Sequence, residues 1–151
     1  MSANECDRAQ AIDLIWFAES NRGKCAKMYP HKNGKSWGEF GINNMELWNV
    51  DGPSCRPILH NTPVEDQHLA CGRILDKCMS RIRSANMYVI GTEPKIPENW
   101  IEAACLYHHG TYVKHSEYRD KLVKEYERCW SRFNTIQQNV IVGKKHGQSA
   151  R

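Results

Sequence analysis

The stretch from Val64 to Ser84 constrains the fold most, because its apolar residues repeat at the spacing of an α-helix. The apolar positions are Cys71, Ile74, Leu75, Cys78, Met79 and Ile82. The opposite face is basic, and we interpret it as solvated; it carries Arg73, Lys77, Arg81 and Arg83. A long amphipathic helix is stable only when other elements cover its apolar face. The sequence therefore predicts a helical protein built around this segment.

Shorter elements surround this helix, and most of them are also predicted to be helical. In chain order we expect a helix from Asn4 to Ala18, a strand-and-turn segment from Lys35 to Asn44, a helical turn from Met45 to Val50, a helix opened by Glu98-Asn99-Trp100 and ended by Gly110, and a helix from Ser116 to Phe133. Ser2 and Asn4 are candidate caps of the first helix. The expected class is mainly α, or α+β, with a small β-element that lines a cleft.

The length of 151 residues fits a single domain, since domains most often have about 100–150 residues. We assign residues 1–138 to this domain and expect the basic segment 139–151 to be a disordered tail. No apolar stretch approaches the ~20 residues that a membrane span needs. The net charge of +4 gives nucleic-acid binding little support. We expect a monomer that neither spans a membrane nor binds nucleic acid.

Seven cysteines are many for a cytosolic protein of this size. They predict two or three disulfides, one unpaired thiol and an oxidising destination. Alternatively, Cys71, Cys78 and Cys105 are small apolar residues buried in helices. There is no CxxC pair, so we expect no zinc site. The N-terminus lacks the basic and apolar regions of a signal peptide, so we expect a removed signal, a phage particle or holin-dependent release.

Glu19 is the strongest candidate for a catalytic residue. It follows an apolar run, Ile12 to Ala18, that predicts the buried face of the first helix. A carboxyl group at the end of such a helix is partly desolvated, and desolvation disfavours its charged form. Such a group can hold a proton near neutral pH and pass it to a leaving oxygen, as in glycoside cleavage. The alternative interpretation is a surface residue that follows a helix.

Three motifs in this order resemble the lysozyme superfamily, and most closely its lytic transglycosylases and goose-type lysozymes. In that family a helix ends in Glu-Ser, as at Glu19-Ser20. A turn with an aromatic-Gly pair follows, similar to the segment from Trp37 to Asn44. A later helix ends in Ala-Tyr-Asn-x-Gly, which resembles Leu106-Tyr107-His108-His109-Gly110 with a His in place of the Asn. The resemblance covers most of the chain.

The turn motif aligns with the family in two registers, and both stay open. In the first, Trp37-Gly38 is the aromatic-Gly pair, Gly41 replaces the family's Gln, and Ser36 takes the place of a second acid. This register predicts a single-carboxylate enzyme. In the second, Phe40-Gly41 is the pair, Asn44 replaces the Gln, and Glu39 is the second acid. We favour the second register because it keeps an amide side chain and supplies the acid.

The resemblance implies cleavage of the β-1,4 bond between N-acetylmuramic acid and N-acetylglucosamine in peptidoglycan. We expect a lytic transglycosylase, in which Glu19 first protonates the glycosidic oxygen. Glu19 then deprotonates the muramic C6 hydroxyl, which closes a 1,6-anhydro ring. The alternative is a hydrolytic lysozyme, similar to a phage endolysin, that uses Glu19 and Glu39.

The same resemblance implies the remaining site residues and the setting. Ser20 is expected to orient the catalytic acid, and Asn44, Tyr107 and His108 to contact the sugars. We expect no metal and no organic cofactor. The expected partners are peptidoglycan glycan strands and components of a phage or secretion machine. The expected location is the bacterial cell envelope or periplasm, or delivery by a phage. An alternative from another class is a non-catalytic, lysozyme-like assembly protein of such a machine.

Overall fold

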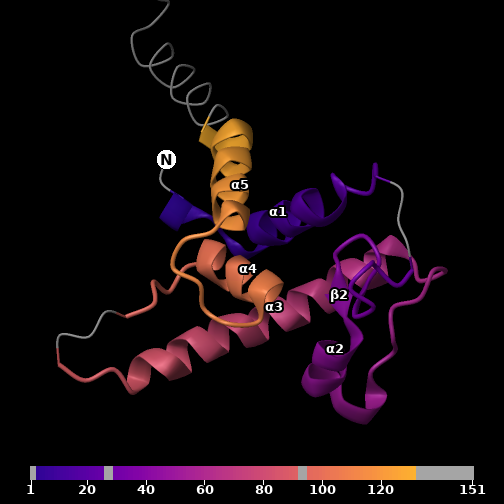
Figure 1. The fold of residues 1–151 in the computed structure, drawn as a ribbon, viewed down its shortest axis with the longest axis horizontal. Coiled ribbons are helices and arrows are strands. Elements are labelled where there is room, and N and C mark those ends of the chain that lie inside the picture. Colours follow the sequence, from indigo (N-terminus) through magenta and orange to yellow (C-terminus); the bar gives the residue numbers. More distant parts are fainter. Residues whose placement is uncertain (1–2, 26–28, 92–94, 132–151) are drawn as a thin grey trace, which may run out of the picture.

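The computed structural model describes residues 3–25, 29–91 and 95–131, and its fold is mainly helical (Figure 1). The helices are α1 (Arg8–Ser20), α2 (Asn44–Asp51), α3 (Val64–Met87), α4 (Trp100–His109) and α5 (Glu117–Tyr126). Short 3-10 turns occupy Ala3–Glu5 and Gly52–Ser54, and a π-helical turn, Glu127–Ser131, extends α5. The predicted mainly α class is confirmed. Phe133 and the predicted tail 139–151 lie outside the described residues.

The long helix α3 runs across the fold, with α1, α4 and α5 on one side of it and α2 on the other (Figure 1). It packs against α4 and α2, while α1 packs against α5, α4 and α3. All six apolar positions predicted for the inner face of α3 are buried: Cys71, Ile74, Leu75, Cys78, Met79 and Ile82. They meet fully buried side chains of the other helices, such as Leu14 and Ile15 of α1 and Leu122 of α5. The core therefore forms where the helical period predicted it.

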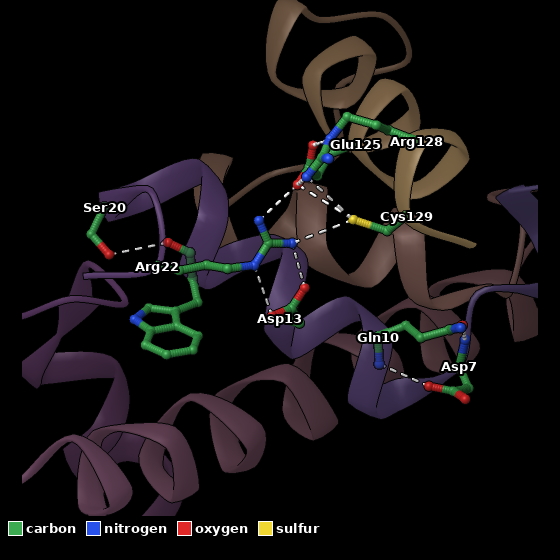
Figure 2. Close-up of polar contacts among 9 residues, drawn as sticks. Asp7, Gln10, Asp13, Ser20, Arg22, Glu125, Arg128 and Cys129 are labelled. Atoms are coloured by element: carbon green, nitrogen blue, oxygen red, sulfur yellow. Dashed lines mark hydrogen bonds and ion pairs between the residues drawn. The ribbon is translucent and has the colours of Figure 1, made fainter. Parts of the chain in front are cut away.

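The first helix starts later than the sequence predicted. Asp7 is its N-cap: the Asp7 carboxylate accepts a hydrogen bond from the Gln10 backbone N–H at 2.8 Å, and the Gln10 side chain accepts one from the Asp7 N–H (Figure 2). This reciprocal capping box satisfies N–H groups that a helix leaves unpaired at its start. Asn4 lies in the preceding 3-10 turn, and Ser2 lies outside the described residues. Asn4 therefore does not cap α1.

The predicted strand-and-turn segment is a small antiparallel hairpin. Strand β1 (Ser36–Trp37) pairs with β2 (Ile42–Asn43), with Ser36 opposite Asn43 and Trp37 opposite Ile42. Two glycines of the connecting turn have positive φ, +78° at Gly38 and +58° at Gly41. α2 begins directly after β2, with Asn43 as its N-cap. The hairpin and α2 lie near one end of α3 (Figure 1).

All seven cysteines lie in the described part of the chain, and each is a free thiol. The disulfides that we expected are therefore not formed in this structure. Cys71 and Cys78 of α3 and Cys105 of α4 are buried, as in the alternative interpretation of these residues as small apolar side chains. Burial raises the pKa of the Cys105 thiol to about 12 and that of Cys78 to about 11. Thiols of this kind stay protonated and unreactive.

Candidate active site

Glu19 lies in the last turn of α1, at the wall of a cavity of about 270 Å³. Its side chain is only 14% exposed. The cavity lies between the hairpin, the start of α2 and the end of α4, and Ile74 of α3 also lines it. A second hollow of about 360 Å³ is lined by Trp37 and shares Lys35 and Asn43 with the first. Glu19 is thus a carboxylate with little solvent contact in the wall of this cavity.

Gly41 brings the backbone of the hairpin turn against the Glu19 carboxylate. A Cβ atom at Gly41 would overlap the Glu19 side chain. The φ angle of +58° at Gly41 is in the left-handed region, where glycine is favoured because it has no Cβ. Two independent constraints therefore require glycine here, and together they fix the distance between the turn and the carboxylate.

His108, in the last turn of α4, contacts the same carboxylate. Its Nδ1 lies 3.2 Å from Glu19 Oε2. The imidazole stacks on the ring of Tyr118 from α5, with centroids 3.8 Å apart and planes 7° from parallel. Burial, and secondarily the charge of Glu19, raise the pKa of the Tyr118 phenol well above its usual range. The stack holds the His108 ring in the orientation that contacts Glu19.

Tyr107 connects α4 to the hairpin turn. Its hydroxyl donates a hydrogen bond of 2.7 Å to the backbone carbonyl of Phe40, next to Gly41. Burial raises the pKa of this phenol well above its usual range, so it remains a donor. Tyr107 also lines the cavity beside Glu19. The structure therefore brings together Glu19, Tyr107 and His108, three residues that the sequence predicted for one site.

Glu39 is not among the residues that line this cavity. Its carboxylate accepts a hydrogen bond of 3.1 Å from the Trp16 indole, and it lies so close to Gly23 that a Cβ there would overlap it. The Glu39 backbone N–H donates to Gln67 on α3 at 2.8 Å. The geometry thus assigns Glu39 to the contact between the turn and α1, in place of the expected second acid of the cleft.

Ser20 and Asn44 also have structural partners, and Asn44 in addition lines the second hollow. Ser20 is 2% exposed; its hydroxyl donates to the Trp16 carbonyl at 3.1 Å and accepts from the Gly23 N–H at 2.9 Å. It therefore caps the end of α1 and does not orient Glu19. The Asn44 amide exchanges two hydrogen bonds with the backbone of Ile58, at 3.2 and 2.9 Å. Asn43, one residue earlier, lines the cavity, and so does Asn33.

Glu46 is a cavity residue that the sequence argument missed. It lies in the first turn of α2, and its carboxylate pairs with Lys77 of α3 at 3.5 Å. Its side chain is 38% exposed, against 14% for Glu19, so the two carboxylates face different surroundings. The feature of the sequence that could have identified Glu46 is its position in the first helical turn after the hairpin. A strand directly followed by a helix places that first turn beside the hairpin.

A charged cluster holds the chain directly after Glu19 (Figure 2). The Arg22 guanidinium donates to both oxygens of Asp13, at 3.0 and 2.6 Å, and to Glu125 of α5 at 2.7 Å. Arg128 binds both oxygens of the same Glu125 at 2.7 Å, and the Cys129 thiol lies 3.5 Å from it. Arg22 has a φ of +56°, and these bonds hold it in that conformation. The cluster therefore fixes the end of α1 against α5.

A larger cavity, of about 570 Å³, is separate from this site. It lies between the segment that follows α2 and the start of α3, and Pro57, Asp66 and Arg73 are among its lining residues. None of the residues that the sequence singled out for catalysis or sugar binding lines it. In the described part of the chain, His, Cys, Asp and Glu residues form no group of three that could hold a metal ion.

Comparison with known proteins found no protein-family model, no curated protein and no solved structure that matches this chain. The similarity to the lysozyme superfamily therefore rests on the three motifs in the sequence.

Proposed function

We propose that this protein cleaves the β-1,4 bond between N-acetylmuramic acid and N-acetylglucosamine in peptidoglycan. One observation carries the proposal: the nearly buried carboxylate of Glu19 opens into a walled cavity and contacts His108 and the Gly41 turn. A general acid needs this combination of low solvent contact, fixed orientation and access to substrate. The three motifs that resemble the lysozyme superfamily supply the substrate class.

In the proposed mechanism Glu19 protonates the glycosidic oxygen while an oxocarbenium-like state develops. The same carboxylate then accepts the proton of the muramic C6 hydroxyl, which closes a 1,6-anhydro ring without consuming water. This transglycosylase route needs one acid only, and the position of Glu39 outside the cavity is consistent with it. His108 and Tyr107 support the acid and the adjacent turn through the bonds described above.

A second candidate is hydrolysis, and Glu46 is the observation that favours it. Hydrolytic glycosidases use two carboxyl groups in different environments, one as acid and one to stabilise positive charge or position water. Glu46 lines the same cavity as Glu19, and its carboxylate lies 3.5 Å from the Lys77 ammonium. In this route Glu46, in place of Glu39, would position the water.

The test is digestion of purified peptidoglycan with wild-type protein, Glu19→Gln, Glu46→Gln and Glu39→Gln, followed by mass spectrometry of the released muropeptides. Glu39→Gln is the matched control, because Glu39 is a carboxylate of the nearby hairpin turn that lies outside the cavity. The proposal predicts anhydro ends that disappear with Glu19→Gln and persist with the other two variants. Reducing ends that are lost with Glu46→Gln would establish hydrolysis. No release by folded wild-type protein would contradict both routes and favour an assembly protein.

The proposed substrate also implies the setting. A peptidoglycan-cleaving enzyme acts at the bacterial cell envelope, so we propose the envelope or periplasm, or delivery by a phage, as its location. Among the described residues, no helix has both the length and the apolar character that crossing a membrane requires.

A further inference from the structure

The second hollow, of about 360 Å³, differs in charge from the cavity of Glu19. Two carboxylates, Glu19 and Glu46, line the cavity. The hollow is lined by the ammonium-bearing Lys35 together with aromatic, apolar and amide side chains, and none of the described residues that line it is acidic. Lys35 and Asn43 line both spaces, so the two are neighbours. A ligand that reaches from one to the other therefore meets acids first and a cation second.

Hydrogen bonds within the preceding loop fix the backbone at Lys35. The side-chain oxygen of Asn33 accepts from the N–H groups of Lys35 and Ser36, each at 2.9 Å, and the Asn33 amide donates to the Ser36 hydroxyl. The His31 N–H donates to the Ser36 carbonyl at 2.7 Å. The Lys35 side chain is exposed, and within the described residues no hydrogen bond or ion pair involves its ammonium group. The loop thus presents an unpaired cation where the two spaces meet.

The other charges near this boundary do not neutralise Lys35. Lys32, the second lysine of the loop, is exposed and adds positive charge. The Glu39 carboxylate accepts a hydrogen bond from an indole of α1 and lines neither space. The Glu46 carboxylate faces the Glu19 cavity and lies 3.5 Å from the Lys77 ammonium. The hollow is therefore a positive region next to an acidic cavity.

The other groups of the hollow suit a sugar ring. Trp37 supplies an aromatic surface with a large apolar area. Asn43 uses its side-chain oxygen to cap α2, where it accepts from the Met45 N–H at 2.9 Å. Its NH2 group has no acceptor among the described residues, so it can donate to a ligand. An apolar wall with a few placed polar groups is typical of small-ligand sites, and Lys35 adds a preference for an anion.

We propose that this hollow binds a muramic acid residue of the glycan strand, with Lys35 as the partner of its free lactyl carboxylate. The inference rests on the proposed function, which supplies the glycan strand. The lactyl carboxyl is charged when no peptide is attached to it, and it becomes a neutral amide when a stem peptide is attached. A cation is stabilised by the charged form only. Lys35 therefore favours strands from which the peptides have been removed.

The experiment is an NMR titration of the full chain carrying Glu19→Gln, which prevents cleavage, with a tetrasaccharide of alternating N-acetylglucosamine and N-acetylmuramic acid. Three forms are compared, in which the lactyl groups are free carboxylates, methylamides, or amides of L-alanine. The free-carboxylate form is expected to bind about fivefold more tightly than the other two, as an exposed ion pair allows. Lys35→Gln in the same chain is expected to reduce this ratio to about one.

Lys32→Gln is the matched control, because Lys32 is an exposed lysine of the same loop that lines neither space. It is expected to keep the fivefold ratio. Equal binding of the carboxylate and methylamide forms, equal losses for Lys32→Gln and Lys35→Gln, or no binding of any form would each overturn the proposal. Equally tight binding of the alanine form would overturn the preference for peptide-free strands, because its carboxylate lies farther from the sugar.

Failure of this inference and failure of the proposed reaction give different results. The fivefold ratio without muropeptide release by wild-type protein would support the Lys35 site and contradict catalysis by Glu19. Muropeptide release without the fivefold ratio would support catalysis and contradict the Lys35 site.

Discussion

The acid sensitivity of this protein should depend on Glu125, the carboxylate shared by Arg22 and Arg128 (Figure 2). Glu125 is 5% exposed, and its hydrogen bonds from Arg128, followed by those from Arg22, lower its pKa from 4.5 to about 2. A group with a lowered pKa stabilises the fold above its unfolded-state pKa, and that contribution is lost as the pH falls through the folded-state value. The window for Glu125 therefore runs from about pH 4.5 down to about pH 2.

The difference between these two pKa values corresponds to about 3 kcal/mol of stability at neutral pH. About 2 kcal/mol of this is lost on going from about pH 7 to about pH 3. Urea unfolding of wild-type protein and of Glu125→Gln at both pH values measures the loss. Glu125→Gln should be less stable than the wild type at neutral pH. Between the two pH values its free energy of unfolding should fall by about 2 kcal/mol less than that of the wild type.

The control is Glu127→Gln, because Glu127 is an exposed carboxylate two residues after Glu125, at the start of the π-helical turn. Its loss of stability on acidification should equal that of the wild type. If Glu125→Gln and the wild type lost the same free energy of unfolding between the two pH values, the role of the Arg22–Glu125–Arg128 cluster would be refuted. A higher neutral-pH stability of Glu125→Gln would refute it as well.

Three further predictions concern the residues around Glu19. Gly41→Ala should cost about 2 kcal/mol in urea unfolding, because a side chain at φ +58° is strained and its Cβ overlaps Glu19; stability equal to the wild type would contradict this. Tyr107→Phe should cost about 1 kcal/mol, because it leaves the buried Phe40 carbonyl without its donor; thermal unfolding should show the loss, and an unchanged midpoint would argue against it. His108→Ala should reduce muropeptide release more than His108→Asn, because Asn keeps a donor near Glu19; equal rates would show that the contact is unimportant.

The parts of the fold that could be predicted are those set by local sequence. The helical period of α3 predicted six of its ten buried residues, and Asn99 and Gly110 marked the two ends of α4. The start of α1 was predicted too early, because Ser2 and Asn4 also have side chains that can cap a helix, whereas the capping box of Asp7 with Gln10 determines the boundary. A capping box was visible in the sequence as Asp followed by Gln three residues later.

The site could be predicted only where a motif fixes the geometry. Glu19, Tyr107 and His108 meet as expected from the ends of two helices. The directions of Glu39 and Glu46 could not be predicted, because positive φ angles at Gly38 and Gly41 decide which side of the turn each backbone segment faces. The hairpin strands are too short for the alternation of side chains to predict which face each residue lies on.

The ion pair between Arg22 and Glu125 could not be predicted from the sequence either, because it joins residues far apart in the chain. No local period or motif links an arginine just after the first helix to a glutamate within the last one. Only the packing of α1 against α5 brings the two together.

The measurement that tests the central claim most directly is the initial rate of muropeptide release from purified peptidoglycan by wild-type protein and by Glu19→Gln at equal concentrations. The account predicts release by the wild type and a loss of about 100-fold or more in the variant, since a general acid contributes at least that factor. The variant should unfold at the same urea concentration as the wild type. A folded Glu19→Gln that releases muropeptides at the wild-type rate would contradict the claim that Glu19 is the catalytic acid.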